Sequence, residues 1–184
     1  ECHEQLDDLE LAKMFYKLSL ELAPLLPDAW LGLGIIEDLE DNTREGITLI
    51  KKASDLDPEN AGIYHVLAGA YEKIEEFENA DENYQLALAL DPNDEECLTN
   101  YISLLKKASV QNAFDYLINF EGIKQENKIV IVLKVSLLWG LGSKVDSIQL
   151  FKECIEINKL KALELFEIHP SLKTVSEFVL LADN

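Results

Sequence analysis

Histidine and cysteine side chains are the first residues of this sequence that could bind a metal or act as nucleophiles. The three histidines are separated by long stretches of chain, and no His-Glu-x-x-His motif or nearby Cys/His pair accompanies them: His3, His65 and His169. The cysteines are equally scattered and form neither a CxxC metal pair nor a disulfide framework: Cys2, Cys97 and Cys154. We therefore expect no metal site and interpret the cysteines as free thiols that are buried or half-buried.

Glycine and carboxylate clusters could bind phosphate, bind calcium or transfer protons. Residues 32–34 and 140–142 each give a GxG, but the third glycine of a dinucleotide-binding loop is missing from both. The acidic stretch 91–96 lacks the turn glycine and the distant bidentate glutamate of a calcium loop. The carboxylate pairs at 37–38 and 75–76 fall at helix ends and turns, where acids mainly serve solubility. The sequence thus predicts a protein that is not an enzyme, with no cofactor and no catalytic residue.

Composition and charge narrow the classes of partner. The 184 residues are 48% hydrophobic, and 35 acids against 16 bases give a formal net charge of −19. Most of this charge lies in residues 1–120, with 26 acids and 8 bases, whereas residues 121–184 have 9 and 8. Such a surface repels phosphate backbones and anionic lipids, so we expect no nucleic acid and no membrane partner. The longest apolar run, residues 129–142, is too short to cross a bilayer.

The start of the chain carries no basic segment followed by an apolar one, so no secretory signal is visible. Together with the unpaired cysteine pattern, this predicts a cytoplasmic location. The chain begins with Glu rather than Met. We therefore expect it to be a piece of a longer protein.

Self-similarity at one fixed interval organises the chain. It appears as Pro24, Pro58 and Pro92, which are evenly spaced, and an aromatic follows the first two prolines at the same offset, as Trp30 and Tyr64. Further columns recur at this repeat interval: Ala12, Gly46 and Ala80; Tyr16, Ile50 and Tyr84; Ser19, Ala53 and Ala87. Apolar residues within each period follow helical spacing. Each period therefore predicts a helical hairpin, whose small residues let two helices approach closely and whose prolines and acids open the following helix.

The run from Ala61 to Pro92 resembles a tetratricopeptide repeat, with the aromatic, the Leu-small pair and the small, tyrosine and proline columns of that family. The preceding repeat departs from the pattern at Glu37, where an aromatic is usual, and at Gly46, where alanine is usual. We expect both changes to weaken packing locally. The resemblance implies an all-α fold, a right-handed superhelical solenoid of helical hairpins.

We predict a single array over residues 1–184. It comprises a partial repeat (1–26, with a truncated first helix and a complete second one), two clear repeats (27–60 and 61–94), two degenerate repeats (95–128 and 129–158) and terminal capping helices (159–184). In both degenerate repeats the turn between the helices is predicted to be one residue shorter than upstream. Their register shows as six pairs of residues: Leu98 and Val132, Tyr101 and Val135, Leu105 and Trp139, Ala113 and Ser147, Leu117 and Phe151, and Phe120 and Cys154.

The resemblance implies that the first helices of the repeats line a concave groove. Helical geometry then names the candidate partner contacts: Leu31, Ile35, Asp38, His65, Gly69, Glu72, Thr99, Ser103, Lys106, Leu133 and Leu137. The family's clamp for the acidic tails of chaperones needs Lys and Asn where this chain has Leu31 with Ile35 and His65 with Gly69. A chaperone-tail adaptor is therefore disfavoured.

The function that we predict is a non-catalytic protein–protein interaction scaffold, which holds a segment of a partner protein in the groove. Charge complementarity makes a neutral or basic segment a better ligand than an acidic one. Two alternatives stay open: a structural spacer that self-associates through an exposed end face, and the accessory region of an enzyme whose catalytic domain lies upstream.

Overall fold

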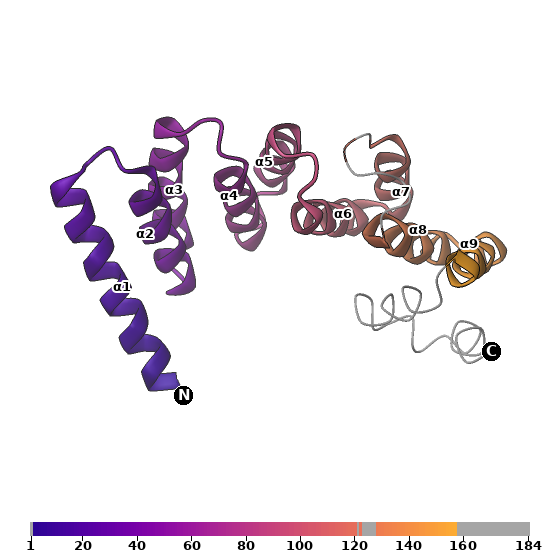
Figure 1. Cartoon of the computed structure of the whole chain (residues 1–184), viewed down its shortest axis with the longest axis horizontal. Helices are drawn as coiled ribbons and strands as arrows, with labels where there is room; N and C mark the ends of the chain where they lie inside the picture. Colours follow the sequence, from indigo (N-terminus) through magenta and orange to yellow (C-terminus); the bar gives the residue numbers. More distant parts are fainter. Residues whose placement is uncertain (1, 121, 123–127, 158–184) are drawn as a thin grey trace. The chain divides into compact units, whose positions relative to one another are not determined.

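The computed structural model of the protein describes residues 2–120, 122 and 128–157, and within these ranges every regular element is an α-helix. The chain divides into two compact units, residues 1–92 and 93–184. Unit 1 contains α1 (Cys2–Leu22), α2 (Pro27–Leu39), α3 (Thr43–Leu56), α4 (Ala61–Lys73) and α5 (Phe77–Leu90) (Figure 1). Unit 2 contains α6 (Glu95–Ala108), α7 (Val110–Asn119), α8 (Lys128–Gly140) and α9 (Lys144–Ile157). The predicted capping helices at 159–184 lie outside the described residues.

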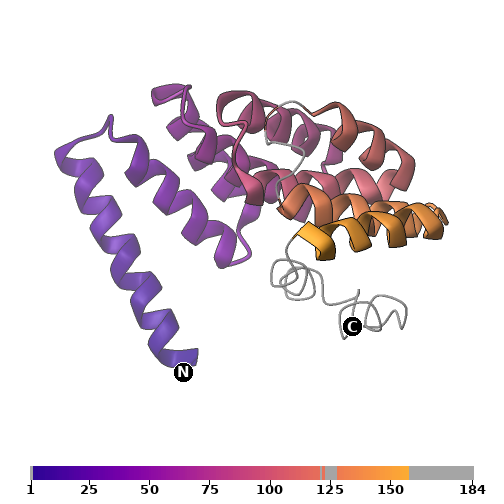
Figure 2. The same ribbon diagram turned by 45° about the vertical axis from the view of Figure 1, so that its right-hand side comes forward.

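Consecutive helices pair as antiparallel hairpins, and α2 and α3 lie side by side in both views of unit 1 (Figures 1 and 2). The turns inside the two hairpins of unit 1 are equivalent. Asp41 and Glu75, which are one repeat interval apart, both adopt a left-handed backbone conformation, with φ of 64° and 61°. The next amide in each turn donates back to a carbonyl in the helix before it, as Asn42 does to Glu37 at 2.8 Å. These bonds satisfy carbonyls that the end of a helix leaves open.

The turns of unit 2 differ from each other. A single residue, Ser109, joins α6 and α7, and its hydroxyl accepts the amide of Asn112 at 3.3 Å. Three residues join α8 and α9, as in unit 1, and Gly142 takes the left-handed position with φ of 80°. Both turns were predicted to be one residue shorter than those of unit 1, but the first is two residues shorter and the second is not shorter at all. The prediction for the second was wrong because a left-handed turn of this kind needs all three residues.

The N-termini of α4 and α6 are stabilised by polar capping side chains and not by proline. Asn60 caps α4 by accepting the amide of Gly62 at 3.1 Å, and Asp94 caps α6 by accepting the amides of Glu96 and Cys97. Pro58 and Pro92 lie in the preceding turns, outside the helices they were predicted to open. Among the prolines that the structure describes, only Pro27 occupies the first turn of a helix, that of α2.

The aromatic that follows each proline has a clear role in the structure. The Trp30 indole donates to the carbonyl of Pro24 at 2.9 Å, and the Tyr64 hydroxyl donates to that of Pro58 at 3.2 Å. The same bond is thus formed twice at the repeat interval. It ties the turn between two repeats to the first helix of the next one, which explains the constant offset between proline and aromatic.

The first segment differs from the predicted partial hairpin. Residues 2–22 form one continuous helix, α1, instead of a truncated helix followed by a second one. No proline or glycine interrupts these residues, so nothing in the local sequence stops the helix. His3 therefore lies on the same helix as Tyr16.

Burial follows the predicted register even in the degenerate repeats. Eight of the positions paired at the repeat interval are buried: Leu98, Tyr101, Ala113, Leu117, Val132, Val135, Ser147 and Phe151. Three others are half-buried: Leu105, Phe120 and Trp139. Ser147 is polar, but its hydroxyl donates to the carbonyl of Val135 at 2.8 Å. Cys97 is a buried thiol, as predicted for the cysteines.

The expected weakening at Gly46 was wrong. Gly34 on α2 and Gly46 on α3 are both buried, and the two helices approach so closely that each glycine faces the other's carbonyl oxygen. A methyl group on Gly46 would lie 2.7 Å from the Gly34 oxygen, nearer than a carbon atom tolerates. Glycine at position 46 therefore permits closer packing here than the usual alanine would.

Candidate functional site

The candidate contacts of unit 1 lie on the first helices of its two hairpins, which we call the inner face: Leu31, Ile35 and Asp38 on α2, and His65, Gly69 and Glu72 on α4. Leu31 and Ile35 are half-buried, so part of each apolar side chain is open to a ligand. Gly69 is exposed, and no atom lies within 4 Å of the place where a Cβ would be. The inner face is therefore open in the middle of α4.

The polar members of the inner face are held by neighbours. Asp38 accepts the hydroxyl of the buried Thr43 at 2.6 Å, which fixes the start of α3 against α2. Glu72 accepts the hydroxyl of the buried Tyr84 at 3.1 Å, and the His65 ring is tilted against the Tyr84 ring with centroids 6.1 Å apart. Asp38 and Glu72 thus present carboxylates whose positions are set by the hairpin core.

Two lysines that the sequence reasoning did not single out link α2 to its neighbours. Lys13 on α1 lies 2.8 Å from Glu37 and 2.7 Å from Glu40. Lys73 on α4 donates to the Asp38 carbonyl at 2.6 Å and lies 3.3 Å from its carboxylate. The signal available for Lys73 was its place one helical turn after Gly69, on the same helical face.

The electrostatic reason for these contacts lies in the end of α2. Its last turns carry acids and no basic residue, although the carboxyl end of a helix is already negative. Lys13 supplies positive charge from one side, and its hydrogen bonds to Glu37 and Glu40 raise its pKa well above the ordinary value. On the other side, burial opposes the charged form of Lys73, but its hydrogen bonds with Asp41 and Asp38 and the negative charge of these two residues together outweigh burial and raise its pKa.

Glu37 depends on Lys13 for its charge state. The hydrogen bond from Lys13 is the main cause of a lowered Glu37 pKa, and Asn42 also donates to this carboxylate at 3.1 Å. Glu37 stands where the family has an aromatic, and the equivalent residue of the next repeat is the buried Tyr71. At this position an ion pair with Lys13 of α1 replaces the aromatic packing that is usual in the family.

We expect Glu37→Gln to lower the free energy of unfolding by about 1 kcal/mol at neutral pH, because the pair with Lys13 is only partly exposed. Since the folded pKa of Glu37 lies below the ordinary 4.5, its contribution is present above pH 4.5 and is lost as pH falls through the folded pKa. The difference between variant and parent should therefore shrink in acid. Urea unfolding at neutral pH and at about pH 3 measures this.

Arg44→Met is the matched control, because the exposed Arg44–Glu76 pair at 3.2 Å should contribute almost nothing. A Glu37→Gln effect that keeps its size in acid, or that equals the control's, would contradict the assignment.

The other candidates lie in unit 2. Thr99 is half-buried and donates to the Glu95 carbonyl at 2.7 Å, whereas Ser103 and Lys106 are exposed on the same helix, α6. Leu133 and Leu137 on α8 are buried, with 8% and 1% of their surface exposed. They contribute to the unit's own core and offer little surface to a ligand.

The remaining motifs have structural roles where the structure describes them. In the GxG at 32–34, Gly32 lies against the Tyr16 ring and Gly34 against α3, which is close helix packing. In the acidic stretch 91–96, Asp94 caps a helix. A shallow depression of about 500 Å³ lies beside the end of α2 with a charged lining: Glu37, Asp41, Asn42, Thr43, Arg44, Glu45 and Ile74.

Among the described helices, none is both long enough and apolar enough to cross a membrane. Helical hairpins that recur at a constant interval define an all-α helical-repeat solenoid. A sequence model described as tetratricopeptide repeat matches residues 1–24 and 61–94. These two segments therefore match the tetratricopeptide repeat family that the sequence was predicted to resemble.

Solved structures support the same fold. MamA is 22% identical with a TM-score of 0.67, and the match covers 91% of this chain and 94% of MamA. YrrB, described as a TPR protein with an unusual peptide-binding site, is 19% identical with a TM-score of 0.59, over 89% of this chain and 86% of YrrB. The O-GlcNAc transferase of Thermobaculum terrenum, as a K341M mutant, is 19% identical with a TM-score of 0.57, over 61% of this chain and 22% of that enzyme. A comparison with curated protein sequences found no match.

Proposed function

We propose that the chain is a non-catalytic scaffold that binds an extended segment of a partner protein on the inner face of unit 1. The open space at Gly69 is the observation that carries this proposal. It leaves room for a backbone or side chain of a ligand between half-buried apolar residues on α2 and the carboxylate of Glu72 on α4. Tetratricopeptide repeat proteins bind proteins and peptides, and YrrB is described as having a peptide-binding site.

The net charge of unit 1 favours one class of ligand over another. Residues 1–92 carry 22 acids and 6 bases, a net charge of −16. Lys73 points its ammonium at Asp38 and Asp41, so it is already neutralised by carboxylates. A neutral or basic segment with apolar side chains for Leu31 and Ile35 is therefore the favoured partner, and an acidic segment is disfavoured by repulsion.

The test compares a basic and an acidic peptide of equal hydrophobicity, both containing prolines so that neither forms a helix. Affinity is measured by fluorescence anisotropy for the parent chain and for Gly69→Trp, which fills the open space. Ala89→Trp is the matched control, since Ala89 is exposed on α5 and away from the inner face. Repeating the titration at about 0.5 M salt separates charge from apolar contact.

We expect the basic peptide to bind more tightly and Gly69→Trp to weaken it by about tenfold or more, because a bound segment and the indole cannot share one space. Ala89→Trp should bind like the parent. Tighter binding of the acidic peptide, or equal loss in both tryptophan variants, would overturn the proposal.

A further inference from the structure

The outer side of α1 carries an apolar stripe that no other described part of unit 1 covers. It consists of Leu11, Met14, Phe15, Leu18 and Leu22, all between 47% and 81% exposed. Four of them, Leu11, Phe15, Leu18 and Leu22, follow the spacing of four, three and four by which one helix packs along another. The face of α1 that contacts α2 is a different one, which includes Lys13 and Tyr16. Contiguous exposed apolar surface of this kind marks an interaction site.

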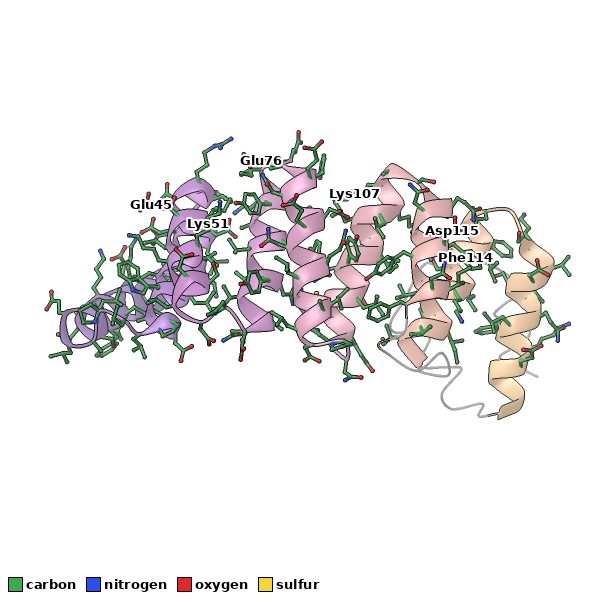
Figure 3. The ribbon with its side chains drawn as sticks, turned by 90° about the horizontal axis from the view of Figure 1, so that it is seen from above. Glu45, Lys51, Glu76, Lys107, Phe114 and Asp115 are labelled. Carbon is green, nitrogen blue, oxygen red and sulfur yellow. The ribbon has the colours of Figure 1, made fainter. Side chains whose placement is uncertain are left out.

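Stacking of repeats does not explain the α1 stripe. The residues one repeat later in the same register can be compared directly, because α3 has helices packed on both of its sides, α2 and α4. Its counterparts of Leu11, Met14 and Leu18 are exposed and polar: Glu45 (labelled in Figure 3), Thr48 and Lys52. The α5 counterparts are exposed as well: Asn79, Glu82 and Leu86. At these three positions a second helix therefore remains open in unit 1. The α3 counterparts of Phe15 and Leu22 are apolar as well, the half-buried Leu49 and the exposed Leu56, but of the three second helices α1 alone is apolar at all five positions.

The edge of the α1 stripe shows which charges a partner would meet. A shallow depression of about 450 Å³ runs along it, lined by Glu10, Lys13, Met14, Lys17, Leu18 and Glu21. Lys13 is held by Glu37 and Glu40, which leaves Glu10, Lys17 and Glu21 to face an incoming side chain. The surroundings of the stripe are thus acidic overall.

We propose that the α1 stripe is a second binding surface, independent of the inner face, and that it binds an amphipathic helix of a partner protein with basic residues flanking its apolar side. The helical spacing of the stripe selects a helix over an extended segment. The net charge of −16 on unit 1 selects basic flanks and disfavours a second copy of this chain, whose identical surface would repel it.

Met14 gives a direct readout, because it is the only methionine of the chain and lies within the stripe. The parent chain, labelled at the methionine methyl group, is titrated with a designed amphipathic peptide of roughly 18 residues, five helical turns, made of Leu, Ala and Lys. Two matched peptides serve as probes of specificity: one with Glu in place of every Lys, and one with the basic composition scrambled so that no apolar face forms. We expect only the first peptide to shift the Met14 methyl resonance.

A variant that transfers surface residues of α3 onto α1, which we call the graft, tests whether the peptide binds at the stripe. The triple variant Leu11→Glu, Met14→Thr, Leu18→Lys gives α1 the residues that α3 exposes in the same register, and it leaves the net formal charge unchanged. We expect it to fold like the parent and to bind the basic amphipathic peptide at least about tenfold more weakly, since three apolar contacts are lost. Leu86→Thr is the matched control, because Leu86 occupies the register of Leu18 on α5 and is equally exposed.

The Met14 titration uses the parent chain, so it tests the proposal even if the graft variant fails to fold. A shift with the acidic or scrambled peptide, or no shift at all, overturns it. Unchanged affinity of a folded graft also overturns it. If sedimentation showed that the parent is a dimer and the graft a monomer, and if no peptide bound, the stripe would be assigned to contact with a second copy instead. Gly69→Trp should leave this binding unchanged, so failure here is distinct from failure at the inner face.

Discussion

Gly34→Ala is expected to lower the free energy of unfolding by about 1–3 kcal/mol, although alanine is the better helix former. A methyl group at this position would lie 2.8 Å from the Gly46 carbonyl oxygen and 3.1 Å from the Ile50 amide nitrogen. Both of these are backbone atoms, which cannot turn aside as a flexible side chain can. The two helices of the first hairpin would have to separate, and the packing along their whole length would suffer.

Gly46→Ala tests the same close contact between α2 and α3, and it introduces the residue that the family usually has at this position. We expect a loss of similar size, since the new methyl would lie 2.7 Å from the Gly34 oxygen. Gly69→Ala is the matched control: it lies mid-helix with open space around it and should gain up to about 1 kcal/mol from helix propensity. Urea unfolding followed by circular dichroism measures all three variants. If Gly34→Ala proved as stable as Gly69→Ala, the close helix crossing would be refuted.

Tyr84→Ala is expected to have the largest effect of a single substitution, about 3–4 kcal/mol, with a folded but much less stable unit 1. The Tyr84 ring is 2% exposed in the second hairpin, and its removal leaves a cavity between α4 and α5. Tyr84→Phe keeps the ring and loses the hydrogen bond from the hydroxyl to Glu72, so a loss of about 1 kcal/mol is expected.

Leu86→Ala controls for a general effect of truncation on α5. Leu86 follows closely on the same helix but is 48% exposed, so its loss should stay within about 0.5 kcal/mol. Denaturation midpoints of the three variants should therefore rank as Leu86→Ala, Tyr84→Phe and Tyr84→Ala, from most to least stable. A Tyr84→Phe variant as unstable as Tyr84→Ala would mean that the hydroxyl, and not the ring, dominates.

The repeat architecture could be read from the sequence because it depends on local regularity. The constant repeat interval puts Tyr16, Ile50 and Tyr84 in equivalent helical positions, and helices repeat their environment faithfully from one hairpin to the next. The same logic located the buried positions of the degenerate repeats, such as Leu98 with Val132, even where the family's prolines are absent. It also selected the inner face of α2 and α4.

The errors arose where a residue's role depends on a neighbour far along the chain. Glu37 looked like a lost aromatic until Lys13, which belongs to the preceding helix, was seen across the α1–α2 contact. Gly46 looked like a weakened position until its distance from the Gly34 carbonyl was known. Likewise, the sequence did not reveal that Lys73 connects α4 to α2, because its contact with Asp38 depends on how the two helices pack.

By itself the sequence determined the class of fold, the number and spacing of the clear repeats and the acidic character of the chain. Periodicity and net charge are sums over many residues, so no single misjudged contact alters them. Only the tertiary structure decided that α1 is one helix with an open apolar stripe, that Gly69 leaves space on the inner face, and that two lysines neutralise the end of α2. These features depend on distances of a few ångströms between residues on different helices, and such distances are set by how the helices pack.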